Sequence, residues 1–151
     1  RNAKLVALVL ILGSLVFYFA EKFGKQNSIL SIKKGFWIGV FQCFALVPGF
    51  SRSGATISGG LFLGLNREEA TRFSFLLSVP VILGSGLKKL FELNSIGELS
   101  NLGGNLLLGS LVAFVVGVFV IHYLLKYLKS HSLNIFGIYR ILLAISILLL
   151  I

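Results

Sequence analysis

The sequence predicts an all-α, polytopic membrane protein that forms a single membrane domain over residues 1–151. Of its 151 residues, 56% are hydrophobic and only 13% are charged. The hydrophobic residues occur in runs of membrane-spanning length, and not at the i, i+3, i+4 spacing of an amphipathic helix. We therefore expect about four transmembrane helices together with one re-entrant helix–loop–helix.

Four apolar runs are the expected spans, because each approaches the roughly 20 residues that a helix needs to cross a bilayer. They cover residues 5–20, 73–87, 106–125 and 135–151. The loop after the first run carries four lysines, Lys22, Lys25, Lys33 and Lys34. Since positively charged loops stay on the cytoplasmic side of a membrane, this loop is expected to face the cytoplasm.

Two shorter apolar runs lie on either side of the segment "LVPGFSRSGATISGG", within residues 35–65. Pro48 and Gly49 are expected to end one helix, and Gly54 to loosen the start of the next. Irregular backbone persists inside a bilayer only where protein or a water-filled cavity surrounds it. We therefore expect residues 35–65 to form a re-entrant helical hairpin, and two complete but unusually short spans are the alternative.

The net charge of +9 comes from 14 lysines and arginines against five acidic residues. Most of these cations gather at the ends of the apolar runs, where anionic lipid headgroups are their natural partners. Membrane lipids are therefore the expected partners, and we set nucleic acid aside. The chain begins with Arg1 and contains no methionine, so we expect that residue 1 is not the native start and that the chain is part of a longer protein.

Arg52 is a permanent charge in an otherwise apolar stretch. A charge at the bilayer centre costs about 2.5 to 3.5 kcal/mol on insertion scales, so it normally faces a partner or a wet cavity. No acidic residue lies in any of the apolar runs. Three partners remain open for Arg52: backbone carbonyls, a carboxylate from a part of the protein outside this chain, or an anionic ligand.

The neighbours of Arg52 favour the anionic ligand. Ser51, Ser53 and Thr56 offer hydroxyl donors, and Gly54 allows a close approach of the backbone. A helix that begins near Gly54 also directs its free N–H groups and its positive dipole end at the same place. These features predict a phosphate-binding site. The alternative is that Ser51 or Ser53 is a plain helix N-cap, with Arg52 as a carbonyl clamp.

The segment "QCFALVPGFSRSGATISGGLFLGLNREEATRFSFLLSVPVI", residues 42–82, resembles the undecaprenyl-diphosphate phosphatase family of the bacitracin-resistance type. The hallmark of that family reads P-G-x-S-R-S-G-x-T, and it is matched by Pro48, Gly49, Ser51, Arg52, Ser53, Gly54 and Thr56. The resemblance covers essentially the whole chain, as the C-terminal portion of a family member. It implies the second half of an inverted-topology repeat in a bacterial cytoplasmic membrane.

The resemblance also implies an activity, the hydrolysis of C55 isoprenyl diphosphate to the monophosphate, which recycles the lipid carrier of the cell wall. Arg52 would neutralise the diphosphate as a catalytic residue, with Ser51 as a second catalytic candidate. Phosphate oxygens would be bound by Ser51, Arg52, Ser53, Gly54 and Thr56, and Pro48 and Gly49 would shape the loop. The substrate partner would be a polyprenyl diphosphate lipid.

The family's E/Q-x-x-x-E motif and its serine-rich segment ending in histidine do not occur in this chain. Mg²⁺ or another divalent cation, which the family implies, is therefore expected to be held by the other half of the protein, and no metal ligand is predicted here. Glu68 and Glu69 are expected in a solvated, charged turn, and His122 and His131 at the membrane interface.

Two alternatives to hydrolysis stay open. A re-entrant hairpin with an anion site near the bilayer midplane also suits a carrier or scramblase for anionic polyprenyl lipids. The second alternative is that the chain is an inactive half-protein or forms a homodimer. In a homodimer, both copies would supply the arginine motif and neither copy would supply the acidic motif.

Overall fold

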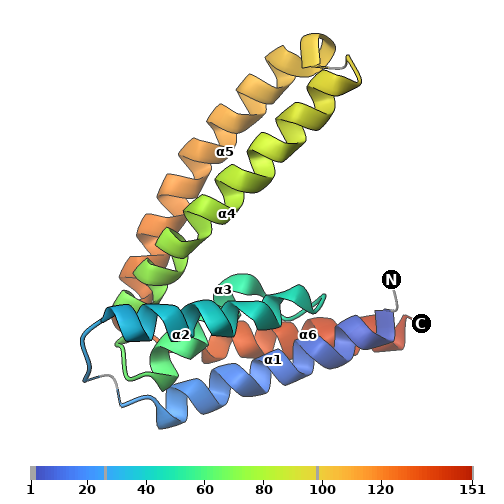
Figure 1. Cartoon of the computed structure of the whole chain (residues 1–151). Helices are drawn as coiled ribbons and strands as arrows, with labels where there is room; N and C mark the ends of the chain where they lie inside the picture. The colour runs from blue at the N-terminus through green and yellow to red at the C-terminus, as the bar shows by residue number, and fades with distance from the viewer. Residues whose placement is uncertain (1–2, 26, 98, 151) are drawn as a thin grey trace.

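The computed structural model describes residues 3–25, 27–97 and 99–150, and these residues are helical apart from short connections (Figure 1). In chain order the elements are α1 (Ala3–Phe23), α2 (Ile32–Gln42), the 3₁₀ turn η1 (Cys43–Leu46), α3 (Arg52–Phe62), α4 (Arg67–Ser95), α5 (Leu99–Leu128) and α6 (Asn134–Leu149). No strand occurs within the described ranges. The predicted all-α class is confirmed.

Among the described residues, three helices are long and apolar enough to cross a membrane: α1, α4, and α5 over Leu102–Leu128. The run predicted as the fourth span forms α6, which has 16 residues. At a rise of 1.5 Å per residue, α6 is about 24 Å long and falls short of the roughly 30 Å hydrocarbon core. The chain is a polytopic membrane protein, with α6 as a shorter apolar helix beside α1.

The helices form a layered body and one long projecting hairpin (Figure 1). In the body, α1 packs along α6, and α3 packs against α1, α2 and α4. The hairpin of α4 and α5 leaves this body at a steep angle, and both chain ends lie together at the far end of α1 and α6 (Figure 1). The main core, where these elements meet, contains Phe17, Ala20, Ile38, Ile57, Leu61, Leu65, Ala70, Leu128 and Leu133.

The α2–α3 hairpin breaks where the sequence predicts. After η1, the chain turns at residues 47–51, where Gly49 has a φ of +98°. A Cβ at Gly49 would also lie 3.0 Å from the Val6 carbonyl oxygen, so the turn is pressed against α1. The helices α2 and α3 have 11 residues each, about 16 Å, and neither is long enough to cross a bilayer alone. These lengths suit a re-entrant hairpin, whose depth in the membrane stays a prediction.

A buried carboxylate ties the body together at the end opposite the chain termini. Glu21 of α1 accepts hydrogen bonds from Arg67, at 3.0 Å from Nε and 2.6 Å from Nη2. It also accepts the backbone N–H of Leu133 at 2.8 Å. One side chain thus joins α1 to the start of α4 and the start of α6, and the sequence analysis did not anticipate it.

Candidate functional site

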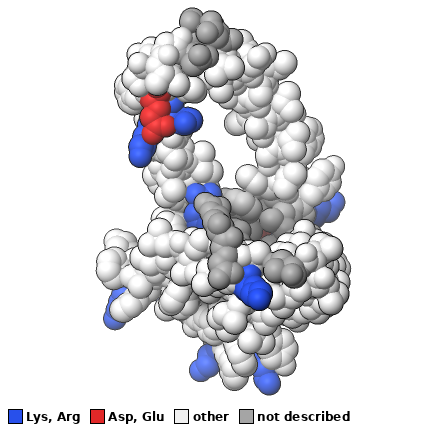
Figure 2. Space-filling view, turned by 90° about the vertical axis from the view of Figure 1, so that its right-hand side faces the viewer, with Lys and Arg blue, Asp and Glu red and all other residues white. Residues whose placement is uncertain are grey.

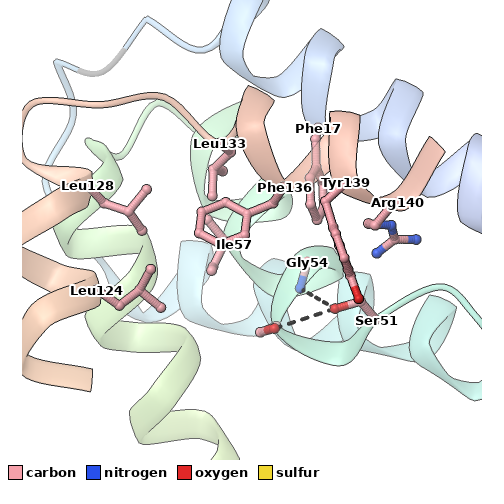
Figure 3. A pocket seen from close by; sticks show the side chains of 11 residues that line it. Phe17, Ser51, Gly54, Ile57, Leu124, Leu128, Leu133, Phe136, Tyr139 and Arg140 are labelled. Atoms are coloured by element: carbon pink, nitrogen blue, oxygen red, sulfur yellow. Dashed lines mark hydrogen bonds between the residues drawn. The ribbon is translucent and has the colours of Figure 1, made fainter. Parts of the chain in front are cut away.

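The start of α3 presents two serine hydroxyls on an exposed surface. Ser51 is the N-cap, with a φ of 78°, and its Oγ accepts the backbone N–H of Gly54 at 3.2 Å. The Oγ of Ser53 lies 3.4 Å from the Oγ of Ser51 (Figure 3). The N-cap alternative is therefore confirmed for Ser51. An N-cap hydroxyl that accepts one hydrogen bond still has its own proton to donate, and the helix start adds a partial positive charge.

Arg52 is the first residue of α3, two residues earlier than the start that the sequence suggested. The Ser51 cap explains the earlier start, because it satisfies a free N–H of the first turn. The Arg52 side chain is half-buried, and within the described ranges its guanidinium makes no hydrogen bond or ion pair. Only its backbone carbonyl is engaged, by Thr56 Oγ1 at 3.1 Å. The guanidinium of Arg52 is thus not a carbonyl clamp.

Thr56 faces away from the two serines. Its side chain is 1% exposed, and its Oγ1 lies 2.6 Å from the Oγ of Ser74 on α4. This hydroxyl pair joins α3 to α4, beside a close approach at which a Cβ on Gly60 would lie 2.8 Å from the Cβ of Ala70. The structure does not bring the Thr56 hydroxyl to the exposed surface of Ser51, and its geometry suits a role in helix packing.

Arg140 is a buried arginine that the sequence analysis missed. It lies on α6, is 7% exposed, and its Nη1 donates to the Phe50 carbonyl at 2.8 Å. Its Nη2 donates to the Gly49 carbonyl at 2.9 Å, and the guanidinium stacks over the Phe17 ring at 5.1 Å. Arg140 is therefore the carbonyl clamp, and it fixes the turn that leads into α3. The same signal that singled out Arg52, an arginine within a predicted span, marks Arg140.

A cavity of about 180 Å³ joins these elements (Figure 3). Its polar side consists of Ser51, Ser53, Gly54 and Arg140, and neither Arg52 nor Thr56 lines it. Its apolar side consists of Phe17, Ile57, Leu124, Leu128, Leu133, Phe136 and Tyr139. Tyr139 reaches from α6 into the cavity beside the serines (Figure 3).

An apolar groove of about 900 Å³ continues from this cavity between α5 and α6. The two spaces share Leu124, Phe136 and Tyr139. The rest of the groove is lined by Phe119, Val120, Tyr123, Tyr127 and Ile135. The arrangement therefore offers a small polar end with hydroxyls and N–H groups, followed by a long apolar surface, which is the pattern that an amphiphilic molecule with a polar head requires.

The residues at this site do not form a metal centre. Within residues 3–25, 27–97 and 99–150, no group of three or more His, Cys, Asp or Glu side chains could hold an ion. Serine hydroxyls and an arginine are also poor ligands for Mg²⁺, which prefers carboxylates and phosphate oxygens. The divalent cation stays a prediction about another part of the protein.

The acidic residues of the "NREEA" segment lie in the first turn of α4 and not in a loop. Asn66 caps this helix by accepting the backbone N–H of Glu69 at 2.9 Å. Acidic side chains are favourable there because the helix N-terminus carries a partial positive charge. Glu68 is also paired, with Arg72 at 3.0 Å and Lys129 at 3.4 Å, so it is not simply solvated.

Comparison with known proteins agrees with the motif. The family model described as bacitracin resistance protein BacA matches residues 1–146. The chain is 51% identical over 146 residues to the undecaprenyl-diphosphatase of Corynebacterium glutamicum, covering 93% of this chain and 50% of the relative. It is 46% identical over 155 residues to the undecaprenyl-diphosphatase of Mycolicibacterium smegmatis, covering 98% and 55%. The chain thus spans about half the length of these curated relatives, and it belongs to the bacitracin resistance protein BacA family.

Proposed function

We propose that this chain is part of an undecaprenyl-diphosphate phosphatase of a bacterial cytoplasmic membrane, and that it supplies the phosphate-binding side of the site. The protein would hydrolyse the C55 isoprenyl diphosphate to the monophosphate and inorganic phosphate. The observation that carries the proposal is the exposed, capped start of α3, where Ser51 and Ser53 flank Arg52 in the sequence and the Arg52 guanidinium has no partner in the described ranges. A diphosphate would supply the negative charge that pairs with this guanidinium and with the helix N-terminus.

The adjoining groove supports an amphiphilic substrate. A soluble phosphate ester would need only the polar end of the site, whereas the apolar groove between α5 and α6 opens directly from it. An isoprenyl chain in this groove would contact aromatic and aliphatic side chains over its length, and each buried CH₂ contributes about 0.8 kcal/mol. The groove thus favours a lipid diphosphate over a water-soluble one.

In this mechanism, Arg52 neutralises the diphosphate and stabilises the negative charge on the phosphoryl oxygens as the terminal phosphoryl group passes to water and the lipid monophosphate leaves. Ser51 and Ser53 donate hydrogen bonds to phosphate oxygens. Ser51 is less suited to be a nucleophile, because no His or carboxylate in the described ranges hydrogen-bonds its Oγ to accept the proton. The acid–base groups and the divalent cation would belong to the half of the relatives that this chain does not match.

The experiment is a phosphate-release assay on the full-length protein in detergent, with C55 isoprenyl diphosphate as substrate. One transition-state donor contributes on the order of 3 kcal/mol, so Arg52→Ala is expected to lower kcat about a hundredfold or more. Arg52→Lys should be nearly as damaging, because an ammonium group cannot form the two parallel hydrogen bonds of a guanidinium. Lys88→Gln, seven residues before the end of α4 and toward the tip of the α4–α5 hairpin, is the control that removes a cation elsewhere and should retain full activity.

Two outcomes would contradict the proposal. A lysine variant as active as the wild type would mean that Arg52 does not clamp phosphate. A wild-type protein that moves the lipid between leaflets but releases no phosphate would favour the carrier or scramblase alternative.

A further inference from the structure

A second, charged pocket lies where the α4–α5 hairpin joins the body. Its volume is about 490 Å³, and it is lined by Glu68, Arg72, His122, Leu125, Lys126 and Lys129. None of these residues lines the cavity at the start of α3. The phosphatase site therefore does not account for this pocket.

The pocket carries three cations and one carboxylate. Glu68 lies between two of the cations, with Oε1 at 3.0 Å from Arg72 Nη2 and Oε2 at 3.4 Å from Lys129 Nζ. This carboxylate holds both positive side chains in position but neutralises only one charge. Lys126, the third cation, has no ion pair or hydrogen bond in the part of the chain that the structure describes. The pocket consequently has a net positive charge of about two, which suits an anion.

As a membrane span, α5 would place this pocket at the depth of lipid headgroups. The apolar part of α5, Leu102–Leu128, has 27 residues and is about 40 Å long. The hydrocarbon core is roughly 30 Å thick, so the ends of this helix extend into the headgroup region. Figure 2 shows acidic and basic side chains together on the upper part of one arm of the hairpin and further basic side chains around the body, while the other arm is white on the face in view. Lys126 lies two residues from the end of this span.

One face of α5 continues from the pocket into an apolar surface. His122, Leu125, Lys126 and Lys129 follow the i, i+3, i+4, i+7 spacing of a single helix face. The preceding turns of this face carry apolar side chains that are exposed, Leu111, Val115 and Val118, at 62%, 44% and 52%. The surface is therefore cationic at the headgroup level and apolar below it, which matches one leaflet of an anionic lipid.

We propose that this pocket binds an anionic phospholipid, with its phosphate held by Arg72, Lys126 and Lys129 and an acyl chain against the apolar face of α5. A basic pocket between membrane-spanning helices is a typical headgroup site. Its carboxylate distinguishes it from a loose group of surface lysines, because Glu68 orients two of the three cations before the lipid arrives. The proposal does not depend on the phosphatase activity.

The test is native mass spectrometry of the full-length protein, with phosphatidylglycerol and phosphatidylcholine titrated as probes. The variant Lys126→Gln/Lys129→Gln is compared with Lys88→Gln/Lys89→Gln, which removes the same charge from the tip of the same hairpin. We expect the pocket variant to weaken phosphatidylglycerol binding about thirtyfold, from the loss of two cations near the headgroup. The tip variant should change it less than about threefold. Lys126→Gln alone, which breaks no ion pair, should lower the logarithm of the phosphatidylglycerol binding constant by about half as much as the double variant does.

Three results would overturn the proposal. Equal losses of phosphatidylglycerol binding in the pocket and tip variants would mean that binding depends only on the net charge of the protein. Phosphatidylcholine that binds as tightly as phosphatidylglycerol would remove the role of the cations. Inorganic phosphate that competes for the pocket as strongly as phosphatidylglycerol would assign it to free phosphate and not to a lipid.

Discussion

Replacement of Arg140 by methionine should loosen the turn that presents the start of α3. The methionine keeps an apolar stem of similar length but removes both hydrogen bonds, at 2.8 Å to the Phe50 carbonyl and 2.9 Å to the Gly49 carbonyl. A hydrogen bond from a charged donor contributes about 1.5–3 kcal/mol, so two contribute roughly 3–6 kcal/mol. In the part of the chain that the structure describes, the buried Nε of Arg140 has no hydrogen-bond partner, so its removal returns about 1–3 kcal/mol. We expect a net loss of about 3 kcal/mol.

The assay is unfolding in detergent, followed by hydrogen exchange of the backbone at residues 47–51. The free energy of unfolding should fall by about 3 kcal/mol, and exchange in this turn should rise more than exchange in α1. Arg140→Lys should recover part of the loss, since an ammonium group can reach one of the two carbonyls. Phosphate release should fall as well, because Ser51 is the last residue of this turn.

A double-mutant cycle with Gly13 isolates the contact. A Cβ at Gly13 would collide with Nη2 of Arg140, so Gly13→Ala alone should mimic the loss of the clamp. In the Arg140→Met background that atom is gone, and Gly13→Ala should cost less than it does alone. An Arg140→Met protein with unchanged stability and unchanged exchange at residues 47–51, or strictly additive effects in the cycle, would refute the reasoning.

The other predictions concern packing and the buried carboxylate. Glu21→Gln should lower the free energy of unfolding by about 2 kcal/mol, because it leaves a partly buried guanidinium without its carboxylate; denaturant unfolding measures this, and an unchanged midpoint would contradict it. Gly54→Ala would bring a Cβ within 2.5 Å of the Phe17 ring and should cost about 1–3 kcal/mol in the same assay. Phe17→Leu should relieve part of that cost, and no relief would argue against the close contact. Thr56→Val should lower stability by about 1 kcal/mol without a change in KM, and a raised KM would return Thr56 to the phosphate site.

The elements near the motif could be predicted because their signals are local. Pro48 and Gly49 interrupt a helix by their own backbone properties, and Ser51 is a favoured N-cap residue. The turn at residues 47–51 follows from these preferences, whereas α3 begins at Arg52, two residues before the start predicted near Gly54. The long apolar helices also follow from hydropathy alone.

The missed features depend on pairings between distant segments. Arg140 contacts carbonyls about 90 residues earlier in the chain, and Glu21 accepts an N–H 112 residues later. No local pattern specifies such partners. The orientation of Thr56 likewise depends on α4, because its hydroxyl shares a hydrogen bond with the Ser74 hydroxyl of that helix. Sequence could therefore identify the phosphate-binding candidates, but only the fold separates the exposed hydroxyls from the one used in packing.

The central claim is that the start of α3 binds the diphosphate, and ³¹P NMR of a non-hydrolysable methylene-bisphosphonate analogue of the lipid tests it most directly. This measurement separates binding from hydrolysis in the full-length protein. We expect the analogue's resonances to shift and broaden with the wild type and with Lys88→Gln, and to stay at their free positions with Arg52→Ala. Equal shifts with the wild type and Arg52→Ala would contradict the account, because the diphosphate would then bind elsewhere.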